Sequence, residues 1–194
     1  MEASQDHEYE GRGRVKAAEV VIITGMSGAG KSQAIKCLED IGFFCIDNLP
    51  TTLIPTFVRL CTQSEHGIAR VALVIDVREG EFLSSLFDIL AMLRAEGHAV
   101  KIVFLDASNE ALVRRFSESR RPHPLAAGKS ALTGIVVERQ MLARLREEAD
   151  LIIDTSTLTI HELKRFLSQA FLVQEPTSRI ALSLVSFSYK HGLP

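Results

Sequence analysis

Short apolar runs alternate with amphipathic stretches along most of the chain. Continuous apolar runs are typical of strands that are buried on both faces, and five occur, at residues 20–24, 43–46, 71–76, 100–105 and 151–153. Apolar residues recur at helical spacing in the segments that follow these runs, at residues 34–41, 53–61, 82–93, 110–118, 135–148 and 160–171. The alternation predicts a mostly parallel sheet with helices on both faces.

A glycine-rich motif follows the first apolar run. It reads Gly25-Met26-Ser27-Gly28-Ala29-Gly30-Lys31-Ser32, which fits the phosphate-binding pattern G-x-x-x-x-G-K-[ST] between a strand and a helix. Glycines let successive N–H groups turn toward an anion, and the helix directs its positive dipole end to the same place. We expect Lys31 on the terminal phosphates and Ser32 on Mg²⁺. A glycine-rich turn with an incidental lysine is the alternative, but it leaves both residues unexplained.

This motif and the alternation together predict a P-loop NTPase fold with three α/β/α layers, which binds the phosphates of a nucleotide with Mg²⁺. Ligands of such sheets lie at the carboxyl ends of the strands, where Asp47, Asp76 and Asp154 are expected. Asp76 follows an apolar strand, as a magnesium-binding acid does, and its alternative role is to cap the next helix. Asp47 is either a residue that orients water or a phosphoryl acceptor, or a turn residue before Asn48.

Two arginine-bearing segments have a functional and a plain interpretation. Arg120 and Arg121, followed by Pro122-His123-Pro124, resemble the arginine lid of small P-loop kinases, in which they would neutralise developing phosphoryl charge. A solvated basic loop is the alternative. Arg78 is either a phosphate ligand or a surface residue. Residues 154–156 (Asp-Thr-Ser) either contact the nucleotide base or cap the following helix.

Composition narrows the class of protein. Of 194 residues, 46% are apolar and 24% charged, as in soluble globular proteins, and the net charge of −2 gives no support to nucleic-acid binding through bulk charge. No apolar stretch approaches the length of a transmembrane helix. Cys37, Cys45 and Cys61 lack metal-ligand spacing and lie in apolar runs, so we expect reduced thiols and a cytoplasmic location. We expect residues 1–18 to be a flexible leader, residues 19–175 the nucleotide-binding domain and residues 176–194 a tail with one more strand at 180–187.

The sequence resembles the RapZ/YvcJ family of nucleotide-binding proteins from about residue 20 to the end. The resemblance is most specific at residues 27–32 and at 38–50, which read LEDIGFFCIDNLP, and it extends to residues 76–78, 104–107, 120–125 and 154–156. It implies ATP at residues 25–32, weak ATPase and GTPase activity, and a GTP-contacting segment formed by Asp76, Val77, Arg78 and Glu79. The residues themselves contain no Asn-Lys-x-Asp motif for guanine.

The resemblance also implies a second domain, which opens with a segment like residues 186–194. Recognition of regulatory proteins or small RNA is attributed largely to that domain, and a homo-oligomer is a further expectation. Two functions compete with a slow regulatory hydrolase. One is a small-molecule kinase that transfers the γ-phosphate of ATP to a metabolite near Asp47, and the other is a nucleotide sensor with negligible turnover.

Overall fold

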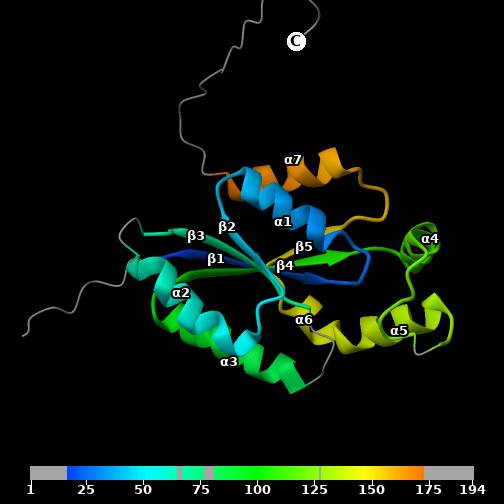
Figure 1. Cartoon of the computed structure of the whole chain (residues 1–194), viewed down its shortest axis with the longest axis horizontal. Helices are drawn as coiled ribbons and strands as arrows, with labels where there is room; N and C mark the ends of the chain where they lie inside the picture. Colours follow the sequence, from blue (N-terminus) through cyan, green and yellow to red (C-terminus); the bar gives the residue numbers. More distant parts are fainter. Residues whose placement is uncertain (1–16, 65–66, 77–80, 127, 173–194) are drawn as a thin grey trace, which may run out of the picture.

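The computed structural model describes residues 17–64, 67–76, 81–126 and 128–172, and its centre is a five-stranded sheet (Figure 1). The strands lie in the order β2-β3-β1-β4-β5, and every neighbouring pair is parallel. Their bounds are β1 Glu19–Gly25, β2 Phe44–Asp47, β3 Arg70–Val74, β4 Ala99–Asp106 and β5 Leu151–Asp154. The predicted parallel sheet is confirmed.

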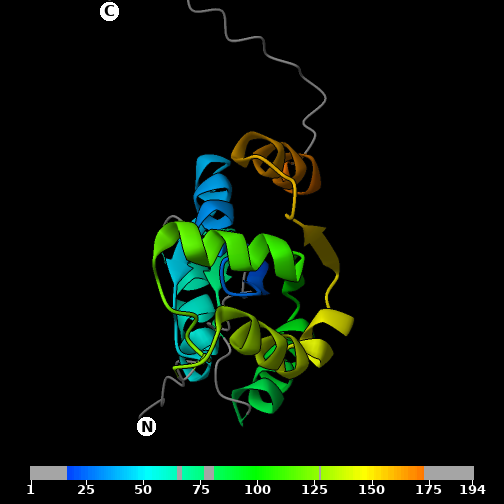
Figure 2. The ribbon, with the colours of Figure 1, turned by 90° about the vertical axis from the view of Figure 1, so that its right-hand side faces the viewer.

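Helices cover both faces of this sheet, which gives three layers (Figures 1 and 2). One face carries α1 and α7, and the other carries α2, α3 and α6, while α4 lies beyond the ends of the strands with α5 next to it. The helix bounds are α1 Lys31–Asp40, α2 Ile54–Gln63, α3 Glu81–Ala95, α4 Asn109–Ser119, α5 Ala131–Met141, α6 Ala143–Glu147 and α7 Ile160–Phe171, with a 3-10 turn η1 at Thr51–Leu53. The predicted three-layer P-loop fold is confirmed.

The apolar runs become the central strands because side chains on both of their faces are covered. In β1, Ile22 and Ile23 are fully buried, and in the adjacent β4, Val103 and Leu105 are fully buried as well. The register pairs Gly25, the last residue of β1, with Leu105. The beginning of the glycine-rich loop is therefore anchored to the middle of the core.

One predicted helix is wrong in its bounds. The segment 135–148 is not continuous: α5 ends at Met141, Leu142 has φ −88° and ψ 0°, and α6 follows. α5 also begins four residues earlier than predicted, because the Ser130 side chain accepts the Thr133 N–H and caps it. The predicted leader up to residue 16, the whole tail of residues 176–194 with its strand at 180–187, and residues 77–79 lie outside the described residues.

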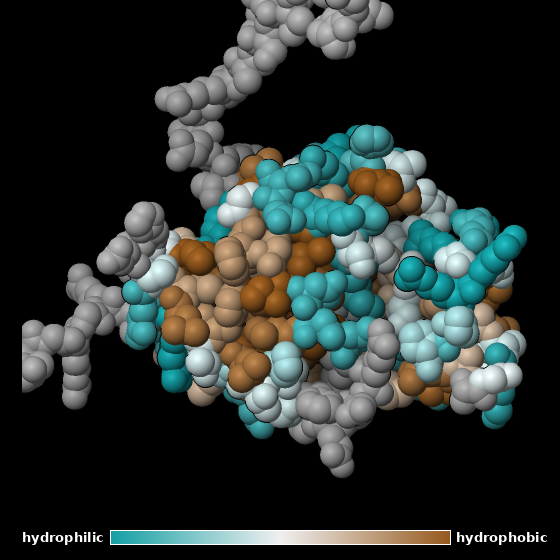
Figure 3. Space-filling model, viewed as in Figure 1, coloured by the Kyte–Doolittle hydropathy of each residue, from teal (hydrophilic) through white to brown (hydrophobic). Residues whose placement is uncertain are grey.

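An apolar face covers part of the surface. Figure 3 shows apolar side chains gathered on the side that carries the edge strand β2 and the helix α2. Phe44, Leu53 and Leu60 are exposed there, and Phe44 stacks on Phe57 with ring centroids 6.0 Å apart. No helix in the described part of the chain combines the length and the apolar character needed to cross a bilayer.

Candidate functional site

The glycine-rich loop of residues 25–32 connects β1 to α1, as predicted. Gly25, Gly28 and Gly30 have φ values of 129°, 84° and 102°, which side chains rarely allow. Gly30 is the N-cap of α1 and provides no side-chain cap, whereas the N-caps of α4, α5 and α7 bind the first turn through Ser108, Ser130 and Thr159. The N-terminus of α1 therefore presents backbone N–H groups without a side-chain acceptor, which is the arrangement that favours an anion.

Lys31 is the first residue of α1, and its ammonium lies over the loop. Lys31 Nζ donates to the carbonyl oxygens of Gly25 at 2.7 Å and Met26 at 3.3 Å. Together with the exposed Ser32, Lys31 lines a pocket of about 370 Å³. The structure thus brings the predicted phosphate and magnesium residues together at one opening.

Two aspartates line the same pocket from neighbouring strands, with Asn48 and Val74 beside them. Asp47 is the last residue of β2, and Asp76 lies two residues beyond the end of β3. Asn48 has a positive φ of 60° and donates its N–H to Val74 O at 3.1 Å, which fixes the turn after Asp47 against β3. Asp47 and Asp76 therefore lie with Lys31 at one pocket, whereas Asp154, which was expected at the same edge of the sheet, lines a different pocket.

A second pocket of about 230 Å³ lies on the other side of the loop. Its walls include Gly28, Gly30, Arg115, Thr155 and Leu158. Arg115 Nη1 donates to Gly28 O at 3.0 Å and to Thr155 Oγ1 at 3.1 Å. This half-buried arginine from α4, which no sequence motif marks, joins the loop to the segment after β5.

Asp154 does not cap the next helix, so that interpretation is wrong. The cap of α7 is Thr159, which forms a capping box with Glu162. Asp154 instead accepts the backbone N–H of Ser156 at 2.8 Å, and its pKa is lowered by hydrogen bonds from the Ser156 hydroxyl and backbone. Thr155, which follows it, is the residue of this segment that touches the loop.

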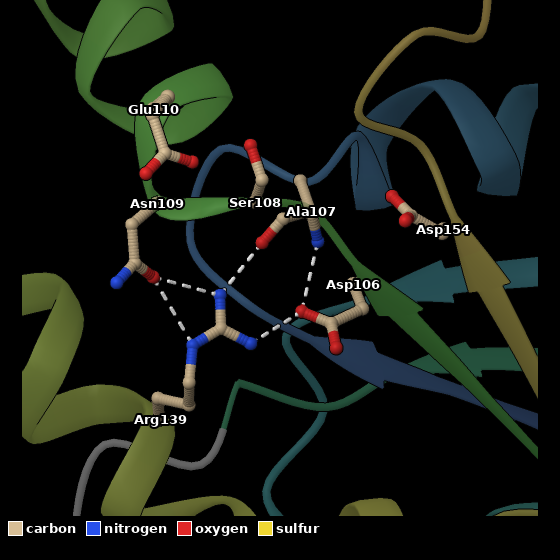
Figure 4. A pocket seen from close by; sticks show the side chains of 7 residues that line it. All are labelled: Asp106, Ala107, Ser108, Asn109, Glu110, Arg139 and Asp154. Atoms are coloured by element: carbon tan, nitrogen blue, oxygen red, sulfur yellow. Dashed lines mark hydrogen bonds and ion pairs between the residues drawn. The ribbon is translucent and has the colours of Figure 1, made fainter.

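A third pocket, of about 270 Å³, lies where β4 ends (Figure 4). Arg139 from α5 donates to Asp106 Oδ1 at 2.7 Å, to Ala107 O at 2.6 Å and to Asn109 Oδ1. Arg146 donates to the second Asp106 oxygen at 3.0 Å. These charged groups are paired with one another. The network therefore supports the turn after β4 and does not indicate a ligand site.

Arg120 and Arg121 are exposed at the end of α4, where Arg120 adopts a left-handed φ of 52°. Neither is among the lining residues of the three pockets described above. Their lid role stays a prediction. His123, two residues on, is buried and lies 3.2 Å from the carboxylate of Glu138, a contact that no local sequence pattern predicts.

A magnesium site here would rest on few protein ligands. The described residues contain no group of three or more His, Cys, Asp and Glu side chains placed to hold a metal. Ser32 and Asp76 offer a hydroxyl and a carboxylate at the same pocket, which are hard oxygen ligands of the kind that Mg²⁺ uses together with phosphate and water. The donor set therefore fits Mg²⁺ bound with a nucleotide, and not a metal held by protein alone.

Comparisons with known proteins agree on family and fold. The family model of the RapZ-like N-terminal domain matches residues 18–175. A protein of Myxococcus xanthus (strain DK1622) is 53% identical over 178 residues, and one of Desulforudis audaxviator (strain MP104C) is 50% identical over 175. These alignments cover 92% and 90% of this chain, and both relatives are named nucleotide-binding protein. The chain spans about 60% of the length of these relatives.

The fold is shared with known kinases. Shikimate kinase from Acinetobacter baumannii superposes with a TM-score of 0.56 at 16% sequence identity, covering 81% of this chain and 94% of that one. Shikimate kinase from Bacteroides thetaiotaomicron gives a TM-score of 0.53 at 17% identity, covering 80% and 99%.

Proposed function

The chain belongs to the family of the RapZ-like N-terminal domain, and on that basis we propose that it binds a nucleoside triphosphate with Mg²⁺ at residues 25–32. We further propose that it hydrolyses the nucleotide slowly, as a regulatory domain of the cytoplasm. The observation that carries the proposal is the loop itself: three glycines with positive φ lead to a helix whose N-cap provides no side-chain acceptor, with Lys31 at its start.

The loop residues have distinct parts in phosphate binding. Backbone N–H groups and the dipole of α1 would hold the β-phosphate, and Lys31 would leave the Gly25 and Met26 carbonyls to bind the terminal phosphate. Ser32 and Asp76 would hold Mg²⁺, which supplies charge neutralisation between the phosphates when bound. Arg120 and Arg121 would reach the transferred phosphate only after a movement, because they do not line this pocket.

Slow turnover follows from the side chains at the pocket. The described lining residues include carboxylates but no histidine, and carboxylates are weak bases near neutral pH. Asp47 is the residue available to orient a water molecule. We therefore expect catalysis to rest on the positioning of this water molecule without a strong general base, and turnover to be slow.

The base of the nucleotide would lie in the second pocket, next to Arg115 and Thr155. This pocket adjoins Gly28 and Gly30 on the side opposite to Asp47. A guanidinium stacks on either purine, so we expect this pocket to accept ATP and GTP alike. The implied guanine contact at residues 77–79 lies outside the described residues.

A small-molecule kinase is the second candidate, and one observation favours it. The pocket beyond Lys31 is about 370 Å³ and is lined by Asp47 and Asn48, which gives it the size and polar groups of a site for a small hydroxyl-bearing acceptor. Incubation with γ-labelled ATP and a metabolite pool distinguishes the two, because a labelled small molecule supports the kinase and labelled inorganic phosphate supports the hydrolase.

Calorimetric titration with ATP and GTP, with and without Mg²⁺, tests the proposal. We expect binding that Lys31→Ala strongly weakens and that Lys36→Ala, which removes an exposed charge from the same helix, leaves unchanged. Folded protein that binds neither nucleotide at millimolar concentration would refute the proposal. Tight binding without phosphate release would instead favour a sensor, and gel filtration with ADP and a non-hydrolysable ATP analogue would then reveal a homo-oligomer or partner complex that depends on the nucleotide.

A further inference from the structure

A buried carboxylate that the proposed chemistry does not use lies beneath the loop. Glu138 on α5 is only 3% exposed, and it faces Ser27 in the middle of the glycine-rich motif. Its Oε2 accepts the Ser27 backbone N–H at 2.9 Å, and its Oε1 accepts the Ser27 hydroxyl at 2.6 Å. A buried carboxylate without hydrogen-bond partners is energetically costly. Both Glu138 oxygens accept hydrogen bonds from Ser27, so the carboxylate and the loop fix each other's position.

His123 completes this arrangement from the segment after α4. Its Nδ1 accepts the Leu125 N–H at 3.1 Å, so Nδ1 carries no proton, and Nε2–H therefore donates to Glu138 Oε2 at 3.2 Å. The ring also has little room to move. A Cβ at Gly134 would lie 2.3 Å from Nδ1, and the ring of Phe116 packs against His123 with centroids 4.8 Å apart.

The chain Ser27–Glu138–His123 joins two parts of the proposed site. Ser27 belongs to the phosphate-binding loop, while His123 lies in the segment that begins with Arg120 and Arg121. A second link runs in parallel, because Arg115 on α4 donates to the carbonyl oxygen of Gly28. The loop is thus held by the helix before the arginine-bearing segment and, through His123, by that segment itself.

We propose that Glu138 and His123 are positioning residues, which hold Ser27 so that the loop keeps its phosphate-binding shape and stays in register with the arginine-bearing segment. This inference rests on the proposed nucleotide binding at residues 25–32. Neither residue needs to touch the nucleotide: Glu138 acts through Ser27, and His123 acts through Glu138.

The test uses the whole chain, MgATP as the ligand and calorimetry as the readout. Glu138→Ala removes the acceptor for all three hydrogen bonds. Glu138→Gln has the same shape, and its amide can accept from Ser27 N–H and His123 and donate to the Ser27 hydroxyl, so every contact is retained without the charge. His123→Phe keeps a ring against Gly134 but loses the bond to Glu138 and the acceptor of the Leu125 N–H. Leu90→Ala, in the buried core of α3, is a destabilised control.

We expect Glu138→Ala and His123→Phe each to weaken MgATP binding by about tenfold or more, the loss that one charge-assisted hydrogen bond represents. Glu138→Gln should stay within about threefold of the unaltered chain, and Glu138→Ala combined with His123→Phe should bind no more weakly than Glu138→Ala alone. Leu90→Ala should lower only the urea midpoint. If Glu138→Ala does not fold, His123→Phe carries the test.

Two negative results are distinguishable. An unaltered chain that binds no MgATP refutes the proposed function, and this inference with it. If the unaltered chain binds MgATP and both Glu138→Ala and His123→Phe bind it equally well, then the proposed function stands and Glu138 and His123 merely stabilise the fold.

Discussion

Replacing Gly25 with alanine tests how closely the loop is built onto the sheet. The Gly25 φ of 129° is unfavourable for any residue with a Cβ, and an alanine Cβ would lie 2.0 Å from the carbonyl oxygen of Leu105 and 2.6 Å from its nitrogen. The chain cannot easily turn away, because the next residue, Met26, donates its N–H to the same Leu105 oxygen at 3.0 Å. The new methyl group therefore has to push β1 and β4 apart.

The cost has two parts. A left-handed backbone conformation with a side chain costs about 1–2 kcal/mol. Forcing an extra methyl into close-packed surroundings adds about 1–3 kcal/mol, and here the obstacle is strand backbone rather than a side chain that can change rotamer. The expected total of about 2–5 kcal/mol is a large part of the 5–15 kcal/mol that stabilises a typical domain.

Urea denaturation of two separate variants, Gly25→Ala and Gly97→Ala, distinguishes the backbone cost from the cost of the steric overlap. Gly97 also has a positive φ, of 91°, but a Cβ there would have no atom within 4 Å. Its substitution therefore measures the backbone cost alone, and the difference between the two variants measures the overlap with Leu105. Equal loss of stability in both variants would show that the contact with Leu105 does not constrain the loop.

Three further predictions concern the site, a helix end and the thiols. Lys31→Ala should weaken ATP binding by about 30-fold or more in calorimetry, since a charge partner of phosphate is lost, while the variant still unfolds cooperatively in urea. Thr159→Ala should cost about 1 kcal/mol in urea denaturation. The pKa of Glu162 is lowered mainly by hydrogen bonds from Thr159. The contribution of Glu162 to stability is therefore complete above its ordinary pKa of 4.5 and is lost as the pH falls through the lower folded value. The cost of Thr159→Ala should thus shrink at pH 3. Burial, with Glu39 adding to it, raises the pKa of Cys45 to about 11, so iodoacetamide at pH 8 should alkylate the folded protein far more slowly than the same chain in urea.

The elements that the sequence predicts well are those whose signal is local. The five strands are short apolar runs, and the loop is a contiguous motif, so neither needs knowledge of distant residues. Strand order follows less directly, yet the expected meeting of Asp47 and Asp76 required only that parallel strands end at one edge of a sheet. The break at Leu142 was missed because apolar residues keep helical spacing across it.

Side chains that support the loop from far along the chain could not be predicted in the same way. Glu138 lies 111 residues from Ser27, and within its own segment it has the ordinary pattern of an acidic residue on a helix. Arg115 lies 87 residues from Gly28 and is one of several arginines on α4 and after it. Only the packing of α4 and α5 beyond the strand ends determines which of these charged residues turn inward.

The carbonyl groups of the loop explain how it keeps its shape. An N–H that points toward a bound anion requires the carbonyl in the same peptide plane to point away, and a buried carbonyl needs a donor. The Ala29 carbonyl lies 2.9 Å from the Thr155 hydroxyl, and the Gly28 carbonyl accepts from Arg115 at 3.0 Å. Because the Ala29 carbonyl is held on that side, the Gly30 N–H is directed to the opposite one. The Thr155 contact outside the loop therefore sets the direction of the Gly30 N–H without touching the phosphate, whereas the Ala29 N–H, which follows the Gly28 carbonyl, donates to Met26 O at 3.0 Å within the loop.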